Sequence, residues 1–380
     1  MDFEFTLEER ALANSVKDFV DKRVEPQMRE IEEKNQIPEK LLAEAAALGL
    51  FGISIPQEYG GSGLSRLSRV LVHQMLGRSG FGFAAALASH TGIGSDALVR
   101  LGTEDQKRRY LPRMSTGELR AAFALTETEA GSDASGIRTS ARKANGRYFL
   151  NGTKCFISGG ERAGLITVIA RSGNGEQRKG ISAFLVEPSF KGFSVGAVQD
   201  TMGTRGQSVA ELVFEDCEVP EENRLGSEGE GWLALTKTMV AARPLIAGRC
   251  IGACERLIEI SAEHAKTRKQ FGKAIGEFQA IQFMLAEMAT RTEAARWLTY
   301  RAATLADRAQ EALETVSMAK LFASETLAFV ADTAMQIQGG SGYITGNTVG
   351  RFYRDARVTR IYEGTSEIQR LIIGREILRR

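Results

Sequence analysis

The segment Ile361-Tyr362-Glu363-Gly364-Thr365 places a single carboxylate between apolar residues and a glycine. Burial disfavours the ionised form of a carboxyl group, so its pKa rises toward the range that suits a general base at neutral pH. Gly364 would let a ligand approach the backbone closely, and Thr365 or Ser366 could cap a following helix. The pattern predicts a base at Glu363, although a carboxylate favoured by a helix N-terminus would look the same.

A second segment, Leu125 to Asp133, offers groups that a cofactor or a phosphate needs. Thr126 and Ser132 carry hydroxyls, and Gly131 exposes backbone N–H groups without a bulky side chain. A polar, capped turn would have the same composition, so this segment alone favours the structural interpretation.

A third segment, Arg268 to Gly272, follows a long helical pattern. Arg268 can form charge-assisted, bidentate hydrogen bonds to phosphate, and Phe271 could cover an adenine or flavin ring. A basic, solvated helix end is an equally good interpretation of this segment alone.

A dinucleotide fingerprint is only formally present. Gly80, Gly82 and Ala85 satisfy G-x-G-x-x-A, but residues 70–79 do not have the pattern of a strand. The spacing therefore indicates the start of a helix rich in small residues.

Length and composition limit the class of protein. A chain of 380 residues exceeds what one core usually organises, so two or three domains are expected. With 43% hydrophobic and 25% charged residues, the chain has the composition of a globular protein, and its net charge of +2 gives no support for nucleic-acid binding. No apolar run suits a membrane span, and the four cysteines and three separated histidines indicate neither a disulfide framework nor a metal site. A cytoplasmic location fits these features.

The secondary structure expected around the three segments changes along the chain from helices to strands and back to helices. Helical patterns fill the first part, with a capping box at Thr6 and Glu9. Short strand-like runs at 165–170, 181–186 and 211–214 follow and suggest a compact antiparallel sheet or barrel. Long helical patterns return at 230–265, 277–310, 313–337 and from about 366, and Pro244 predicts a kink in the first. The predicted domains are 1–119, 120–228 and 229–380.

In this order and spacing, the three segments resemble the acyl-CoA dehydrogenase family over essentially the whole chain. Further matching pieces are Leu101 to Lys107, Asn151 to Lys154, Phe214 to Pro220 and Gln336 to Gly340. The resemblance implies a mainly α fold with a central β domain. Its parts are a helical N-terminal domain, an antiparallel β-barrel-like middle domain and a C-terminal four-helix bundle.

The resemblance also implies a reaction, in which Glu363 takes the α-proton of an acyl-CoA and FAD takes the β-hydride to give the trans-2-enoyl-CoA. A flavin hydroxyl and the Glu363 N–H would stabilise the enolate, as an oxyanion hole does. FAD would be bound by matching residues, some reaching the cofactor of a neighbouring subunit: Phe123, Leu125, Thr126, Gly131, Ser132, Phe156, Ile157, Ser158, Arg268, Gln270, Phe271, Gln279, Gln336, Gly339, Gly340, Thr365 and Glu367. Substrate would contact Ser132, Met239, Arg243 and Gly364.

Two positions distinguish this chain within the family it resembles. Some relatives carry the base immediately before the arginine of the kinked helix, where this chain has Ala242, so the assignment falls on Glu363. Many relatives carry an aspartate for the pantetheine where this chain has Val240, so CoA would be held differently. The apolar loop from Gly80 to Ala84 favours an uncharged aliphatic or alicyclic acyl group.

The implied partners are the acyl-CoA, an electron-transferring flavoprotein as electron acceptor, and further copies of the chain in a homotetramer that is a dimer of dimers. The implied setting is fatty acid metabolism and β-oxidation. Two alternatives remain. A flavin oxidase or monooxygenase on the same scaffold would pass electrons to oxygen, and a non-catalytic, DNA-associated member would show a more basic chain than this one.

Overall fold

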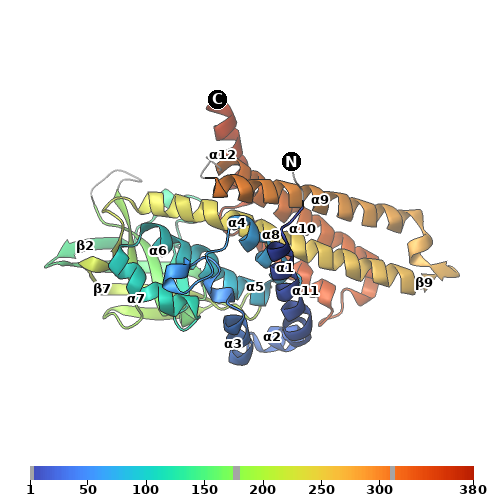
Figure 1. Ribbon diagram of the computed structural model, residues 1–380, viewed down its shortest axis with the longest axis horizontal. Coiled ribbons are helices and arrows are strands. Elements are labelled where there is room, and N and C mark those ends of the chain that lie inside the picture. Colours follow the sequence, from blue (N-terminus) through green and yellow to red (C-terminus); the bar gives the residue numbers. More distant parts are fainter. Residues whose placement is uncertain (1–3, 174–179, 309–312) are drawn as a thin grey trace.

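The computed structural model describes residues 4–173, 180–308 and 313–380. Figure 1 shows an elongated molecule, with a strand-rich region at one end and the small β9 hairpin at the other. Short helices from the first part of the chain lie along the middle, below the long C-terminal helices in this view. No helix within the described residues is long and apolar enough to cross a membrane.

The N-terminal region is helical. Its α-helices are α1 (Leu7–Phe19), α2 (Met28–Lys34), α3 (Glu39–Ala47), α4 (Arg66–Gly77), α5 (Phe81–Ala88), α6 (Ser95–Leu101) and α7 (Glu104–Ser115). The Glu9 N–H donates to Thr6 Oγ1 at 3.1 Å and the Thr6 N–H donates to Glu9 Oε2 at 3.0 Å, which confirms the predicted capping box.

Gly80 lies between α4 and α5 with a φ of +89°, a left-handed conformation that favours glycine. Because the residues before it form a helix, the G-x-G-x-x-A spacing belongs to a helix–helix junction. The prediction of a helix start at this point is confirmed.

The middle region is one sheet with strands β1 (Ala121–Ala124), β2 (Ser140–Ala144), β3 (Arg147–Ser158), β4 (Leu165–Arg171), β5 (Ile181–Val186), β6 (Phe193–Val198), β7 (Val209–Pro220) and β8 (Arg224–Leu225). The strand order is β6-β7-β3-β2-β4-β5-β8, with β1 beside β4. Most neighbours are antiparallel, as predicted, but β1 pairs with β4 in parallel. A parallel pair needs a long crossover, and the chain between β1 and β4, which contains the β2–β3 hairpin, provides it.

The C-terminal region is a helical bundle. Its helices are α8 (Gly231–Thr267), α9 (Gln279–Asp307), α10 (Leu313–Gln338), α11 (Thr348–Val358) and α12 (Ser366–Leu378). The hairpin of β9 (Lys269–Gln270) and β10 (Lys273–Ala274) joins α8 to α9. The helices that the sequence predicted are present, except that residues 309–310 lie outside the described residues. α8 is continuous with Pro244 inside it, and the kink at Pro244 stays a prediction.

Two hydrophobic clusters meet at α8 and connect the regions. One fills the bundle between α8, α9, α10 and α11, and Val240 and Tyr362 pack against it. The other joins the sheet to α6, α7 and the start of α8, and it includes Phe123 and Leu235 with Met239 at its edge. Consecutive residues of α8, Met239 and Val240, therefore contact the cluster of the sheet and the cluster of the bundle respectively.

Candidate active site

Glu363 lies in the loop that joins α11 to α12, in an uncommon backbone conformation. Its φ is +50° and that of Gly364 is +92°, so two consecutive residues are left-handed. A non-glycine residue there is strained, and such strain persists where the surroundings hold it. The positive φ of Gly364 strains any L side chain at this position, and a Cβ would lie 2.7 Å from Gln369 Nε2, so the Gln369 side chain would also have to move.

One oxygen of the Glu363 carboxyl group has no hydrogen-bond donor. Its Oε2 is buried and finds no donor among the described residues. Burial raises the pKa of Glu363, and the charges of Arg249, Lys320 and Arg243 oppose this rise. The buried Oε2 and the raised pKa are features that the sequence led us to expect of a base at this position.

Three cations from two helices surround this carboxyl group. Arg243 on α8 donates to Ser317 Oγ at 3.1 Å, and burial lowers its pKa to about 10. Arg249, two turns along α8, is hydrogen-bonded to His73 of α4 at 3.3 Å. Because a guanidinium only donates, His73 Nδ1 accepts this bond, which leaves the proton on Nε2, 3.4 Å from Thr91 Oγ1.

The third cation is Lys320, a fully buried residue of α10. Its Nζ donates to the carbonyl oxygen of Gly364 at 2.8 Å, and Gln369 Nε2 donates to the same oxygen at 2.9 Å. Burial lowers the pKa of Lys320 to about 8. The loop is therefore held at one carbonyl from α10 and from α12.

The alternative base position is occupied by Ala242, which is buried on α8 beside Arg243. An alanine has no group that can accept a proton. Among the residues at this site, Glu363 is the carboxylate that remains.

The structure brings together the flavin-binding residues predicted in the sheet. Cys155 N–H donates to Thr126 O at 2.9 Å, so the turn after β1 lies against β3, close to Phe156, Ile157 and Ser158. Phe156 has a φ of +58° and its ring is 65% exposed. Phe123 and Ile157 are buried in the sheet, and Gly131 and Ser132 are exposed.

The predicted residues of the C-terminal region lie elsewhere. Figure 1 places the β9 hairpin at the end of the molecule opposite the sheet. The residues concerned are exposed there: Arg268, Gln270, Phe271, Gln279, Gln336, Gly339 and Gly340. Phe271 is 93% exposed, and no atom lies within 4 Å of a Cβ built on Gly339 or Gly340. Within one chain, they do not join the residues of the sheet in a single site.

Thr365 and Glu367 take positions at the start of α12. Thr365 Oγ1 accepts from Ile368 N–H at 3.3 Å, so this side chain is the helix cap that the sequence suggested. Glu367 is exposed in the first turn, where a helix dipole favours a negative charge.

The residues of the sheet fit a flavin. The hydroxyls of Thr126, Ser132 and Ser158 form no hydrogen bond with another described residue, and they lie on segments that the Cys155–Thr126 bond holds together. The Phe156 ring adds an exposed aromatic face on a backbone that its left-handed conformation fixes. Free donors beside an exposed ring are what a polar aromatic cofactor needs.

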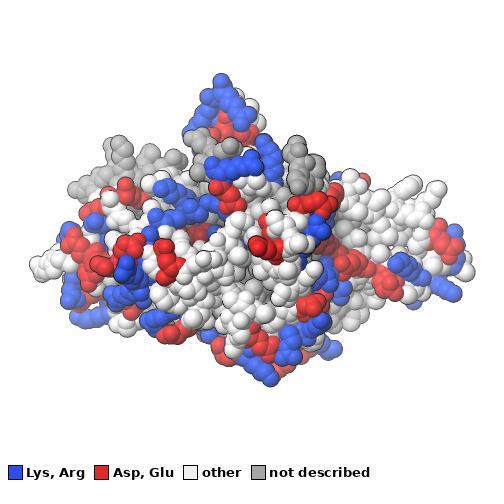
Figure 2. Space-filling view, viewed as in Figure 1, with Lys and Arg blue, Asp and Glu red and all other residues white. Residues whose placement is uncertain are grey.

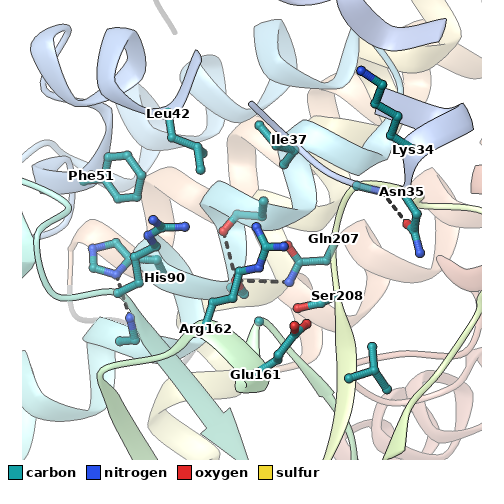
Figure 3. A pocket seen from close by; sticks show the side chains of 17 residues that line it. Lys34, Asn35, Ile37, Leu42, Phe51, His90, Glu161, Arg162, Gln207 and Ser208 are labelled. Atoms are coloured by element: carbon teal, nitrogen blue, oxygen red, sulfur yellow. Dashed lines mark hydrogen bonds between the residues drawn. The ribbon is translucent and has the colours of Figure 1, made fainter. Parts of the chain in front are cut away.

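A cavity of about 290 Å³ is lined by other residues, among them Gly159, which follows Ser158. Figure 3 shows it between the N-terminal helices and the loops of the sheet, with Phe51, His90 and Arg162 around it. Ala121 N–H donates to His90 Nδ1 at 3.0 Å and His90 Nε2 lies 3.0 Å from Met114 O, so His90 is a neutral structural link. Burial lowers the pKa of His90 to about 4. None of the residues predicted from the sequence lines this cavity.

Several residues of the site were missed by sequence analysis. They are Arg249, Lys320 and Gln369 around the Glu363 loop, and Glu127 and Lys154 beside the flavin segment. Lys320 had a signal, because a lysine flanked by apolar residues within the long pattern 313–337 is unusual unless it has a buried partner. No group of His, Cys, Asp and Glu within the described residues could hold a metal ion.

Comparisons with known proteins show the family to which the chain belongs. Profiles of the acyl-CoA dehydrogenase N-terminal, middle and C-terminal domains match residues 6–118, 122–217 and 229–378. The chain belongs to the acyl-CoA dehydrogenase family. It is an oxidoreductase of the FAD-dependent kind, and FAD complexes are found among the structures that it resembles.

Particular relatives cover nearly the whole chain. Acryloyl-CoA reductase (NADH) of Anaerotignum propionicum is 42% identical, covering 100% of this chain and 97% of the relative. The caffeyl-CoA reductase–Etf complex subunit CarC of Acetobacterium woodii is 38% identical, covering 99% and 100%. The structure of butyryl-CoA dehydrogenase from Megasphaera elsdenii is 36% identical with a TM-score of 0.97, and each chain covers 100% of the other.

Proposed function

We propose that this enzyme catalyses the FAD-dependent α,β-dehydrogenation of an acyl-CoA thioester, with Glu363 as the base for the α-proton. The observation that carries the proposal is the state of the Glu363 carboxyl group. Its Oε2 is buried and has no donor among the described residues, and burial raises the pKa of the group. A carboxylate in this state is available to a proton on a ligand, since no described donor occupies that oxygen.

The chain supplies proton transfer and charge stabilisation. The α-proton of a thioester is weakly acidic, so the negative charge that develops on the thioester oxygen needs donors aimed at it. The backbone N–H of Glu363 makes no hydrogen bond within the described residues and is such a donor. Arg243 and Arg249 are held by Ser317 and His73, and their charges favour the ionised base before the transfer.

Flavin binding is assigned to the segments around Thr126 and Phe156, and the bound FAD would accept the β-hydride. Met239 on α8 contacts the same hydrophobic cluster as Phe123 and Leu125, while Arg243, one turn later, faces Glu363. One helix therefore runs from the flavin segment to the base. The position of Met239 and Arg243 on this helix supports their proposed contact with substrate, and Ser132 and Gly364 are proposed as substrate contacts with them.

The acyl group is proposed to be uncharged. Val240 packs against the apolar cluster of the bundle and gives no carboxylate to the pantetheine. Phe81, Phe83 and Ala84, in the loop and helix start that favoured an apolar acyl chain, are fully buried. Affinity for CoA would then rest on contacts other than the aspartate of many relatives.

A second candidate function is the reverse reaction, reduction of an enoyl-CoA. Two relatives across the whole chain are named as acryloyl-CoA reductase and as a caffeyl-CoA reductase subunit in a complex with Etf. Proton transfer at the α-carbon uses the same carboxyl group in both directions. The raised pKa of Glu363 suits the protonated form that the reductive direction requires.

We also propose an electron-transferring flavoprotein as redox partner and a homotetramer, a dimer of dimers, as the assembly. The name of the Acetobacterium woodii relative supports the first. Figure 2 shows a broad uncharged surface at the end that carries the β9 hairpin, where Phe271 and Phe283 are exposed. Exposed aromatic side chains on an uncharged surface suit an interface with a second copy, which would bring Arg268 and Phe271 to the neighbour's flavin.

An anaerobic titration of the yellow holoenzyme with a panel of acyl-CoA thioesters tests the proposal. Saturated acyl-CoAs of suitable length are expected to bleach the flavin band. For the reductive candidate, the dithionite-reduced enzyme is mixed with enoyl-CoAs, and return of the oxidised band is expected. A flavoprotein that none of these thioesters bleaches or reoxidises would contradict both candidates.

A further inference from the structure

The loop that carries Glu363 is held in place by a lysine from another helix. Lys320 is fully buried on α10, and its Nζ donates to Gly364 O at 2.8 Å. That carbonyl follows directly after the two left-handed residues Glu363 and Gly364. Lys320 therefore constrains the strained part of the loop from outside the loop's own helices.

A buried lysine is energetically unfavourable if it serves only to bind one carbonyl oxygen. Within the described residues, the Lys320 ammonium donates one hydrogen bond, although it carries three N–H groups. Gln369 binds the same carbonyl at 2.9 Å with an uncharged amide. Burying a charge that no carboxylate binds directly is unfavourable, so a neutral donor would suffice if the only task were to hold the loop.

The positive charge of Lys320 interacts with the negative charge of Glu363. The groups that act on Lys320 are Glu363, Cys250 and Glu325, which favour its protonated form, and Arg243, which opposes it. Those that act on Glu363 are Arg249, Lys320 and Arg243. Both arginines bind other partners, Ser317 and His73, whereas Lys320 binds the backbone of the residue next to Glu363.

We propose that Lys320 is a positioning residue for the proton transfer. Its hydrogen bond to Gly364 fixes the Glu363–Gly364 backbone and so aims both the carboxylate and the Glu363 N–H, while its positive charge favours the ionised carboxylate. This rests on the proposed function of Glu363 as the base.

Three variants of the FAD-loaded enzyme separate the two roles. Lys320→Gln keeps a donor and removes the charge, Lys320→Met removes both, and Lys320→Arg keeps the charge in another shape. Arg296→Met is the control, because Arg296 lies on the adjacent helix α9 and binds Glu255 at 2.8 Å rather than the loop. The rate of flavin reduction by a saturated acyl-CoA is measured against pH, with kcat and KM separated.

Loss of the Lys320 charge raises the pKa of Glu363 further, so the acidic limb of the rate profile moves to higher pH. We expect a shift of about half a pH unit or more in Lys320→Gln and Lys320→Met. Lys320→Met should also lose about tenfold in kcat with little change in KM, because the base is no longer aimed. Lys320→Arg should restore the acidic limb, and Arg296→Met should leave it unmoved.

A measurement without substrate keeps this inference separate from the proposed function. The infrared band of the protonated Glu363 carboxyl group, identified by its absence in Glu363→Gln, is titrated in the oxidised holoenzyme. Its midpoint should rise in Lys320→Gln relative to the wild type. An unchanged midpoint, or unchanged kcat and acidic limb in Lys320→Met, would overturn the role of Lys320. A wild-type enzyme that no acyl-CoA reduces would instead contradict the proposed function, and the infrared midpoint would still decide the effect of Lys320.

Discussion

Lys154 Nζ lies 2.7 Å from Glu127 Oε1, in an ion pair whose lysine is completely buried. The same ammonium donates to Leu125 O at 2.8 Å, and the N–H groups of Arg138 and Thr139 donate to the Glu127 carboxylate. The pair thus joins β3, the turn after β1 and the residues that lead into β2. These are the segments to which flavin binding is assigned.

Removing the lysine should therefore damage both stability and cofactor binding. Lys154→Met leaves the Glu127 carboxylate buried without its cation, a change that typically costs about 3–5 kcal/mol of unfolding free energy. We expect lower stability in urea and a reduced ratio of flavin to protein absorbance after purification. Lys143→Met is the control, since Lys143 pairs with Glu221 at the exposed surface and its loss should leave both stability and flavin content close to those of the wild type. Full FAD content in Lys154→Met would contradict this role.

Gly364 should tolerate no side chain. Its φ is +92°, and a Cβ would lie 2.7 Å from Gln369 Nε2. Gly364→Ala is expected to lower kcat by about tenfold or more, because the neighbouring base moves from its position. Gly374→Ala in α12 meets no atom within 4 Å, so it should leave kcat unchanged and stabilise the helix by about 0.5–1 kcal/mol. Steady-state kinetics and thermal unfolding of the two variants measure these effects. Equal kcat values in Gly364→Ala and Gly374→Ala would contradict the prediction.

The order of the helices and strands, and the candidate base at Glu363, could be predicted from the sequence because both depend on local patterns. The alternation of strand-like runs and the breaks around Gly364 are visible in consecutive residues. The surroundings of Glu363 are not, since Arg249, Lys320 and His73 come from α8, α10 and α4 and meet only in the folded chain. The parallel pairing of β1 with β4 has the same origin, because it depends on a crossover between distant segments.

The predicted flavin-binding residues show a second limit of prediction from sequence. Those of the sheet lie together, whereas Arg268 and Phe271 lie at the opposite end of the molecule. Spacing along a chain does not say whether two segments meet within one copy or between two. Only an assembly of copies can unite the two sets.

Phe271 offers a direct check of that assembly. Because its side chain is 93% exposed, Phe271→Ala removes almost no packing within one chain. We expect unchanged stability of the isolated fold, but weaker FAD retention and weaker association in sedimentation velocity runs. Leu7→Ala, at a residue 84% exposed on α1, should change neither property. Equal FAD retention and association in both variants would place the cofactor within one chain.

Stability should depend on pH through Glu363. Burial raises its pKa above the ordinary 4.5, so the folded chain binds this proton more tightly than the unfolded chain. The corresponding stability is fully present below about pH 4.5 and is lost as pH rises through the raised pKa. Glu363→Gln does not titrate, so it should be more stable than the wild type near pH 8, by an amount that shrinks toward pH 5. Thermal unfolding of both holoenzymes from pH 5 to pH 8 measures this difference in stability. A difference that does not change with pH would contradict the raised pKa of Glu363.

The central claim is that Glu363 removes the α-proton, and rapid mixing tests it most directly. Wild-type holoenzyme and Glu363→Gln are each mixed anaerobically with a saturated acyl-CoA that bleaches the wild-type flavin, and the flavin band is followed in time. We expect the Gln variant to bind FAD and the acyl-CoA but to reduce its flavin at least about 10³-fold more slowly, because the amide cannot accept the proton. Reduction at a rate near that of the wild type would show that another group is the base.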